Sequence, residues 1–161
     1  MQEACEDFAN GSGSEFLIKY SKFTADLLNL KAAVRLLRVK NGTKLADYAL
    51  SENGNIEKKM IVAAMEKNEL ERVYFRTDLV KAAQVGENAY NNAEDLSEFE
   101  RELERADKGF FAGIKYIGYG PEIVISYINA REREFSLVRT VMSGKMTGVP
   151  HEVIKKRLGI K

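Results

Sequence analysis

Apolar residues recur along this chain at alternating intervals of three and four positions, which is the spacing of one face of an α-helix. Ser14 is placed to cap a helix at its start, and Asn41-Gly42 is expected to end it. The pattern therefore predicts a long amphipathic helix over residues 15–40. Its apolar positions are Phe16, Tyr20, Phe23, Leu27, Leu30, Val34 and Leu37.

Shorter apolar stretches fill the middle of the chain. A short helix is expected over residues 44–50, followed by a loop over residues 51–55, whose Ser, Asn and Gly content is typical of loops. Residues 56–65, 68–75 and 77–90 predict further short helices. A longer helix is expected to begin at Asp95 and to end before Gly118, with Leu96, Phe99, Leu103, Ala106 and Phe110 on its apolar face. At the N-terminus, residues 3–10 predict a short helix that ends at Asn10-Gly11.

Residues 120–158 predict two helices joined by a turn. Pro121 suits the first turn of a helix, because the N–H that proline lacks would have no partner there. Residues 144–148 are expected to form a hinge, and Pro150 to start the last helix. The only β-branched run, residues 123–125, lies inside the helical pattern, so the fold is predicted to be all-α. The apolar face of the first of these two helices consists of Val124, Ile128, Phe135, Val138 and Met142. Four charged residues lie on the same helix: Arg131, Glu132, Glu134 and Arg139.

Composition removes several functional classes. With 161 residues, 45% of them hydrophobic, the chain can bury a core. Cys5 is the only cysteine, so neither an internal disulfide nor a thiolate metal cluster can form within the chain. The 25 basic and 24 acidic residues nearly cancel, which disfavours nucleic acid as a partner. No apolar run is long enough to cross a bilayer, so any membrane role is expected to be peripheral.

No catalytic, cofactor-binding or metal-binding residue is predicted. His151 is the only histidine, and it is interpreted as a solvated residue at a helix start. No Glu is followed three residues later by His, as helical di-metal sites require, and the glycines do not form a phosphate-binding loop. Acidic and basic residues alternate over residues 98–105, which is typical of a solvated helix face. The chain is therefore not expected to be an enzyme.

Several charged residues share or flank the apolar helix faces. A charge in a core needs a partner, so ion pairs are predicted between Asp26 and Arg139, and between Glu134 and Lys31 or Arg35. The alternative is a solvated surface whose long side chains cover apolar neighbours. The residues concerned are Asp26, Lys31, Arg35, Arg38, Glu132, Glu134 and Arg139.

Two blocks of this sequence resemble the C subunit of archaeal and bacterial A/V-type rotary ATPases, the family that includes the eukaryotic V-ATPase d subunit. The first block, residues 25–31 with Arg35 beyond it, is similar to the family's Asp-x-x-Asn-Leu-Lys helix. The second resembles its C-terminal part, through Gly120-Pro121-Glu122, Tyr127, Glu132 to Glu134, Val138-Arg139, Gly144-Lys145, Gly148-Val149-Pro150 and Arg157-Leu158.

The resemblance implies an all-α fold of repeated helical-bundle modules, like that of the V-type ATPase family just named. Residues 1–14 are then an N-terminal helix and Gly/Ser break, residues 15–92 a module that could be incomplete, and residues 93–161 a second module. A weak internal echo supports duplication, although chance would also explain it: Asp26, Lys31 and Asn41-Gly42 correspond to Glu134, Arg139 and Gly144. Since the resembled proteins are longer, the chain is expected to be a fragment that exposes apolar surface and self-associates.

The function that this resemblance implies is mechanical. The chain would be a non-catalytic central-stalk subunit, peripheral on the cytoplasmic face of a membrane, that couples the rotor shaft to the proteolipid ring during proton or sodium transport. Its partners would be the shaft and ring subunits, with no cofactor. The alternative is a free-standing helical adaptor that binds a partner helix. Tyr116, Tyr119, Lys145 and Met146 are the candidate contacts with neighbouring subunits.

Overall fold

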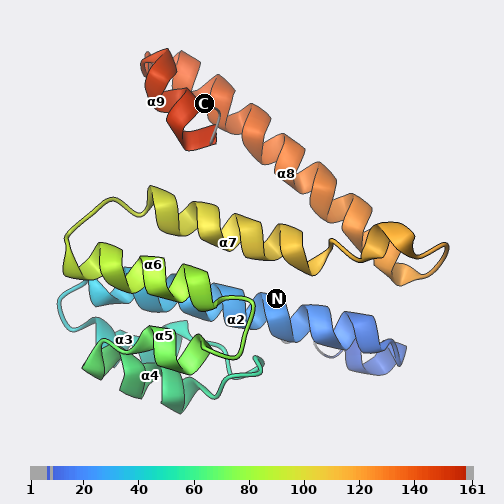
Figure 1. Ribbon diagram of the computed structural model, residues 1–161, viewed down its shortest axis with the longest axis horizontal. Helices are drawn as coiled ribbons and strands as arrows, with labels where there is room; N and C mark the ends of the chain where they lie inside the picture. The colour runs from blue at the N-terminus through green and yellow to red at the C-terminus, as the bar shows by residue number, and fades with distance from the viewer. Residues whose placement is uncertain (1–6, 8, 159–161) are drawn as a thin grey trace. The chain divides into compact units, whose positions relative to one another are not determined.

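The computed structural model describes residue 7 and residues 9–158 (Figure 1). The described residues form helices and no strand, which confirms the predicted all-α fold. The short helix expected over residues 3–10 falls mostly outside this part. The elements are α2 (Glu15–Leu37), α3 (Gly42–Ala49), α4 (Lys58–Lys67), α5 (Leu70–Tyr74), α6 (Val80–Asn91), α7 (Ser97–Phe110), the 3₁₀ helix η1 (Ile114–Tyr116), α8 (Pro121–Met146) and α9 (His151–Leu158).

The chain divides into two compact units, and the division falls between Phe110 and Phe111. The expected module boundary lay earlier, between residues 92 and 93, which would have placed α7 in the second module. In the structure α7 packs on α6, and its Phe99 and Leu103 are buried in the core of the first unit. These buried side chains are the physical reason why α7 belongs to the first unit.

Helix α2 supplies the centre of the first unit and packs against α3, α4 and α6. Leu30, Ala33 and Val34 on its inner face are fully buried. A Cβ atom on Gly86 of α6 would lie 2.7 Å from Val34 Cγ2 and 3.0 Å from Phe99 Cδ2. The missing side chain at Gly86 therefore lets α2, α6 and α7 approach one another closely.

Aromatic side chains extend the contact between α2 and α7 toward the start of α2. The rings of Phe23 and Phe110 stack with their centroids 4.6 Å apart, and Tyr20 lies 5.6 Å from Phe110. Phe16 completes the cluster, at 5.8 Å from Phe110. Aromatic pairs at these separations add to the stability that burial alone provides.

The ends of α2 and α8 can be compared with their predicted positions. Helix α2 ends at Leu37, before Asn41-Gly42, and Asn41 adopts a left-handed conformation that starts α3. Helix α8 ends at Met146, inside the hinge expected at residues 144–148, and the left-handed Gly148 lies in the turn that follows. Gly144 itself is still helical and serves packing, because its Cβ would lie 2.8 Å from Ile154 Cδ1 of α9.

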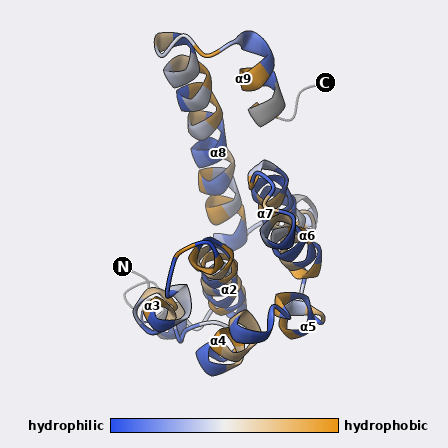
Figure 2. Cartoon of the chain, turned by 90° about the vertical axis from the view of Figure 1, so that its left-hand side faces the viewer, coloured by the Kyte–Doolittle hydropathy of each residue, from blue (hydrophilic) through white to orange (hydrophobic). Residues whose placement is uncertain are grey.

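The second unit is built around α8 and contains little buried surface. No residue of α8 is buried, whereas Ile154 of α9 is buried beside Gly144. Figure 2 shows hydrophobic residues recurring along α8 between hydrophilic ones. The apolar face predicted on this helix thus exists as a pattern, but it remains exposed in the structure.

Candidate functional site

Asp26 anchors the loop between α3 and α4 from the middle of α2. It is only 2% exposed, and its carboxylate accepts hydrogen bonds from the backbone N–H of Asn55 at 3.1 Å and of Ile56 at 3.2 Å. The Asn55 side chain donates a third, at 2.8 Å. A buried carboxylate with three donors is satisfied without a cation. Asp26 therefore has a structural role in loop placement.

Asn29 holds the same loop one turn further along α2. Its side-chain amide donates to the Ser51 carbonyl at 2.9 Å, and the Ser51 N–H donates back to Asn29 Oδ1 at 2.8 Å. Asp26 and Asn29 lie three residues apart, so they share one helix face. We call Asp26 and Asn29, together with Ser51, Asn55 and Ile56, the loop clamp. Because all five bonds come from one short stretch of α2, the clamp fixes the loop to that helix.

Two further residues, Gly54 and Tyr74, lie next to Asp26. A Cβ atom on Gly54 would lie 2.1 Å from Asp26 Oδ1, so only glycine permits this approach of the loop. The Tyr74 hydroxyl of α5 donates to the backbone carbonyl of Asp26 at 3.4 Å. Burial, and secondarily the negative charge of Asp26, raise the pKa of the Tyr74 phenol far above its usual value. Tyr74 is thus a neutral donor that links α5 to α2.

Lys31, Arg35 and Arg38 form a row on α2 that we call the basic row. Lys31 Nζ lies 2.7 Å from Glu100 Oε2, and Arg35 Nη2 lies 2.6 Å from Glu100 Oε1, so both cations bind one carboxylate of α7. Arg38 donates to the backbone carbonyl of Ala89 at 3.0 Å and also to that of Glu94. The basic row therefore ties α2 to α7 and to the end of α6.

The sequence did not predict the partners that these charges have within the first unit, and the ion pairs predicted with Arg139 and Glu134 stay predictions. Asp26, expected to face Arg139, bonds to Asn55 and Ile56. Lys31 and Arg35, expected to face Glu134, bind Glu100. Glu100 had been assigned to a solvated helix face, and Asn55 to an ordinary loop. A usable signal existed only for Asn29, because its spacing from Asp26 puts both side chains on one face.

The charged residues of the second unit lie on the surface of α8. Arg131 donates to Glu134 Oε2 at 2.6 Å and to the Tyr127 hydroxyl at 3.1 Å, and the two hydrogen bonds raise the pKa of Arg131 above its usual value. Glu132 and Arg139 are exposed. Within the described residues, neither of these two side chains has an ion-pair partner or a hydrogen bond.

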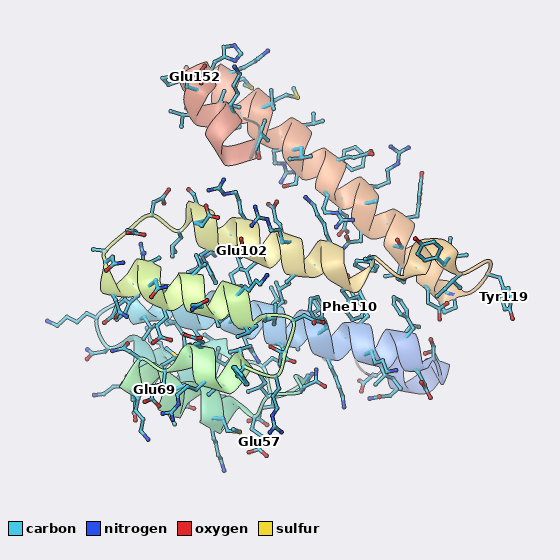
Figure 3. All side chains as sticks on the ribbon, in the orientation of Figure 1. Glu57, Glu69, Glu102, Phe110, Tyr119 and Glu152 are labelled. Atoms are coloured by element: carbon cyan, nitrogen blue, oxygen red, sulfur yellow. The ribbon has the colours of Figure 1, made fainter. Side chains whose placement is uncertain are left out.

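The four residues expected to contact neighbouring subunits are all exposed. Tyr119 is 88% exposed and projects from the loop before α8, as Figure 3 shows, and Tyr116 of η1 is 80% exposed. Met146 is 84% exposed at the end of α8, and Lys145 beside it is also exposed. Exposure makes these side chains accessible to another protein. Whether they contact one stays a prediction.

No catalytic arrangement is seen in the part of the chain that the structure describes. There, no group of three His, Cys, Asp or Glu side chains could hold a metal ion. His151 is exposed at the start of α9, as expected. No described helix combines the length and the apolar character that crossing a bilayer requires. The arrangement of residues is suited to holding helices together and to presenting surfaces.

Comparison with known protein families gives a match that covers nearly the whole chain. The family described as "ATP synthase (C/AC39) subunit" matches residues 1–157. Comparisons with curated proteins and with solved structures gave no match.

Proposed function

This chain belongs to the ATP synthase (C/AC39) subunit family of rotary ATPases, and from that membership we propose that it is a non-catalytic central-stalk subunit. In this role it couples the rotor shaft to the membrane ring during proton or sodium transport. It works at the cytoplasmic face, as a peripheral component that contacts both shaft and proteolipid subunits. The family match over residues 1–157 is the observation that carries the proposal.

The construction of the first unit supports a mechanical role. A coupling piece must transmit force without bending, so its helices need packed contacts and its loops need fixed positions. The buried faces of α2, α6 and α7 supply the packing, and the loop clamp fixes the connection between α3 and α4. The basic row adds bonds from α2 to α7. Polar side chains in this unit are thus used to hold helices and loops in place.

The contacts with neighbouring subunits are proposed to involve the exposed aromatic and terminal residues of the second unit. Tyr119 and Tyr116 offer large side chains with one polar end, which are typical of residues that dominate binding energy. Met146 and Lys145 present an adaptable apolar side chain and a cation beside it. The four residues are exposed, so binding would need no rearrangement of a core.

The test is capture of the purified chain by the detergent-solubilised ring and, separately, by the shaft subunits of the same organism. Retention of the chain by both is the expected result. Tyr119→Ser is expected to weaken retention at least ~fivefold, because a truncated anchor residue costs more than about 1 kcal/mol of binding free energy. Tyr48→Ser is the matched control, since Tyr48 of α3 is 92% exposed but is not among the candidate contacts.

The outcomes separate the proposal from its rival. If neither ring nor shaft retains a chain that circular dichroism shows to be helical, the coupling role is refuted and a free-standing helical adaptor becomes the better interpretation. If Tyr48→Ser weakens retention and Tyr119→Ser does not, the chain couples through α3, and the assignment of the contact residues fails.

A further inference from the structure

One face of α8 carries the repeat of a coiled-coil helix. Val124, Ile128, Arg131, Phe135, Val138 and Met142 follow one another at intervals of four, three, four, three and four residues, and we call them the α8 seam. This alternation is the heptad spacing by which two helices pack along their length. The five apolar members are between 46% and 73% exposed. A seam of this length is unusual on a solvated helix, because it leaves contiguous apolar surface in water.

The surface of the seam has the shape that another helix fills. A shallow hollow on α8 is lined by residues of the seam and its C-terminal continuation, among them Phe135, Val138, Arg139 and Met142. These four stand at positions i, i+3, i+4 and i+7, which is the set that forms a hole for one side chain of a facing helix. The hollow is therefore suited to a helix.

The charges beside the seam favour a second copy of α8 as that helix. Glu132 and Arg139 flank the seam on the same side, seven residues apart, and within the described chain neither has an ion-pair partner. If two copies of α8 pair in antiparallel orientation, centred between Ser136 and Leu137, Glu132 of each copy lies beside Arg139 of the other. The same register places Phe135 opposite Val138. Opposite charges at these flanking positions set the partner and the orientation of coiled-coil helices.

Arg131 distinguishes the two orientations. In a parallel pair it would face the same residue of the other copy in one layer of the seam, and like charges at that separation repel. In the antiparallel pair it faces Met142, and the two Arg131 side chains lie about 16 Å apart along the axis. Its hydrogen bonds to Tyr127 and Glu134 can then remain in place at the edge of the seam.

We propose that α8 is a self-pairing surface, through which two copies of this chain join as an antiparallel helix pair. This goes beyond the coupling role and does not depend on it. Self-pairing buries the seam and pairs Glu132 with Arg139 twice across the twofold axis. Any protein that needs the same face of α8 must compete with the second copy.

The first experiment measures the mass of the whole chain by sedimentation equilibrium over a wide concentration range. A monomer–dimer equilibrium is expected. Arg139→Glu should weaken dimerisation at least ~tenfold, because it places two acidic side chains at each flanking position. Exchanging both charges, with Glu132→Arg and Arg139→Glu in one chain, should restore the dimer. Arg72→Glu, an equal change on α5 of the first unit, should leave it unaltered.

The second experiment tests the orientation in a Cys5→Ser background. Ile128→Cys chains mixed with Lys145→Cys chains should form a disulfide on mild oxidation, because these positions face each other in the antiparallel register. Neither chain should cross-link with itself, since its two cysteines would lie about 25 Å apart. A chain that stays monomeric at all concentrations overturns the proposal, as does a dimer that Arg139→Glu leaves intact or one that Met142→Cys cross-links to itself.

Discussion

The two units of this molecule use apolar helix faces in opposite ways. In the first unit, α2 buries Leu30, Ala33 and Val34 completely, and its Lys31 and Arg35 bind Glu100 of α7. In the second unit, α8 is longer than α2 and carries a similarly spaced apolar stripe that Arg131 interrupts, yet none of its residues is buried. Regular spacing thus marks the face on which a helix can pack, while burial depends on whether another element covers that face.

The largest expected difference in the free energy of unfolding is between truncating an aromatic residue of the first unit and truncating one of the second. Phe99→Ala removes a fully buried side chain between α6 and α7, and we expect it to lower the free energy of unfolding by ~3–5 kcal/mol. At concentrations where the chain is monomeric, Phe135→Ala on α8 removes the same atoms from an exposed site and should change that free energy by less than ~0.5 kcal/mol. Urea unfolding followed by circular dichroism measures both. Equal losses would show that α8 is covered in solution.

The second prediction compares a buried carboxylate with an exposed one. Asp26→Ala leaves the Asn55 and Ile56 amides of the loop clamp without an acceptor, and we expect a loss of ~2–4 kcal/mol. Glu132→Ala on α8 should be nearly neutral in dilute solution. Hydrogen exchange of the loop amides gives an independent readout, because the Asn55 amide should lose protection in the Asp26 variant. Retained protection would show that the loop does not depend on the carboxylate.

Two helical glycines offer a matched pair within the first unit. Gly86→Ala drives a methyl group against Val34 and Phe99, so we expect a loss of ~1–3 kcal/mol from overpacking. Gly109→Ala in α7 adds the same methyl group where no atom lies within 4 Å, and should stabilise by ~0.5–1 kcal/mol through its better helix propensity. Thermal melting of the two variants checks the opposite signs. A stabilised Gly86 variant would disprove the close approach of α2, α6 and α7.

The smallest effect concerns pH. Burial raises the pKa of Tyr74 in the folded chain, whereas an unfolded tyrosine ionises near pH ~10. Above that pH the unfolded state binds fewer protons than the folded state, so the free energy of unfolding falls by up to ~1.4 kcal/mol per pH unit. Tyr74→Phe should remove the contribution of Tyr74 to this decrease. Tyr48→Phe should leave that contribution in place. Urea midpoints between pH 8 and 11 provide the test, and identical slopes for Tyr74→Phe and the original chain would contradict it.

The elements were largely predictable, because helix spacing and cap residues are local signals. Ser14 does accept a hydrogen bond from the Leu17 N–H at the start of α2, and Pro121 does stand in the first turn of α8. The hinge at residues 144–148 was predicted, but its exact start was not, because Gly144 remains helical and packs against Ile154 of α9. Helix ends set by tertiary packing are therefore the weak point of such predictions.

The bonds that hold the first unit together could not be predicted from spacing. Arg35 binds Glu100, which lies 65 residues away in the sequence, and Asp26 bonds to Asn55, which lies 29 residues away. Such pairings depend on how the helices fold back on each other, and many acidic residues in the chain would have matched Arg35 equally well. The resemblance to a family located the Asp-x-x-Asn-Leu-Lys block, but the role of each residue in it became clear only from its neighbours.

The loop clamp has a mechanical consequence. Hydrogen bonds hold the connection between α3 and α4 to consecutive turns of α2 at two points. Asn29 bonds to Ser51, and Asp26 bonds to Asn55 and Ile56. A load applied to that connection enters the axis of α2 directly instead of being absorbed by bending of a slack segment. The loop between α3 and α4 is thereby expected to move together with α2 when force is applied to it.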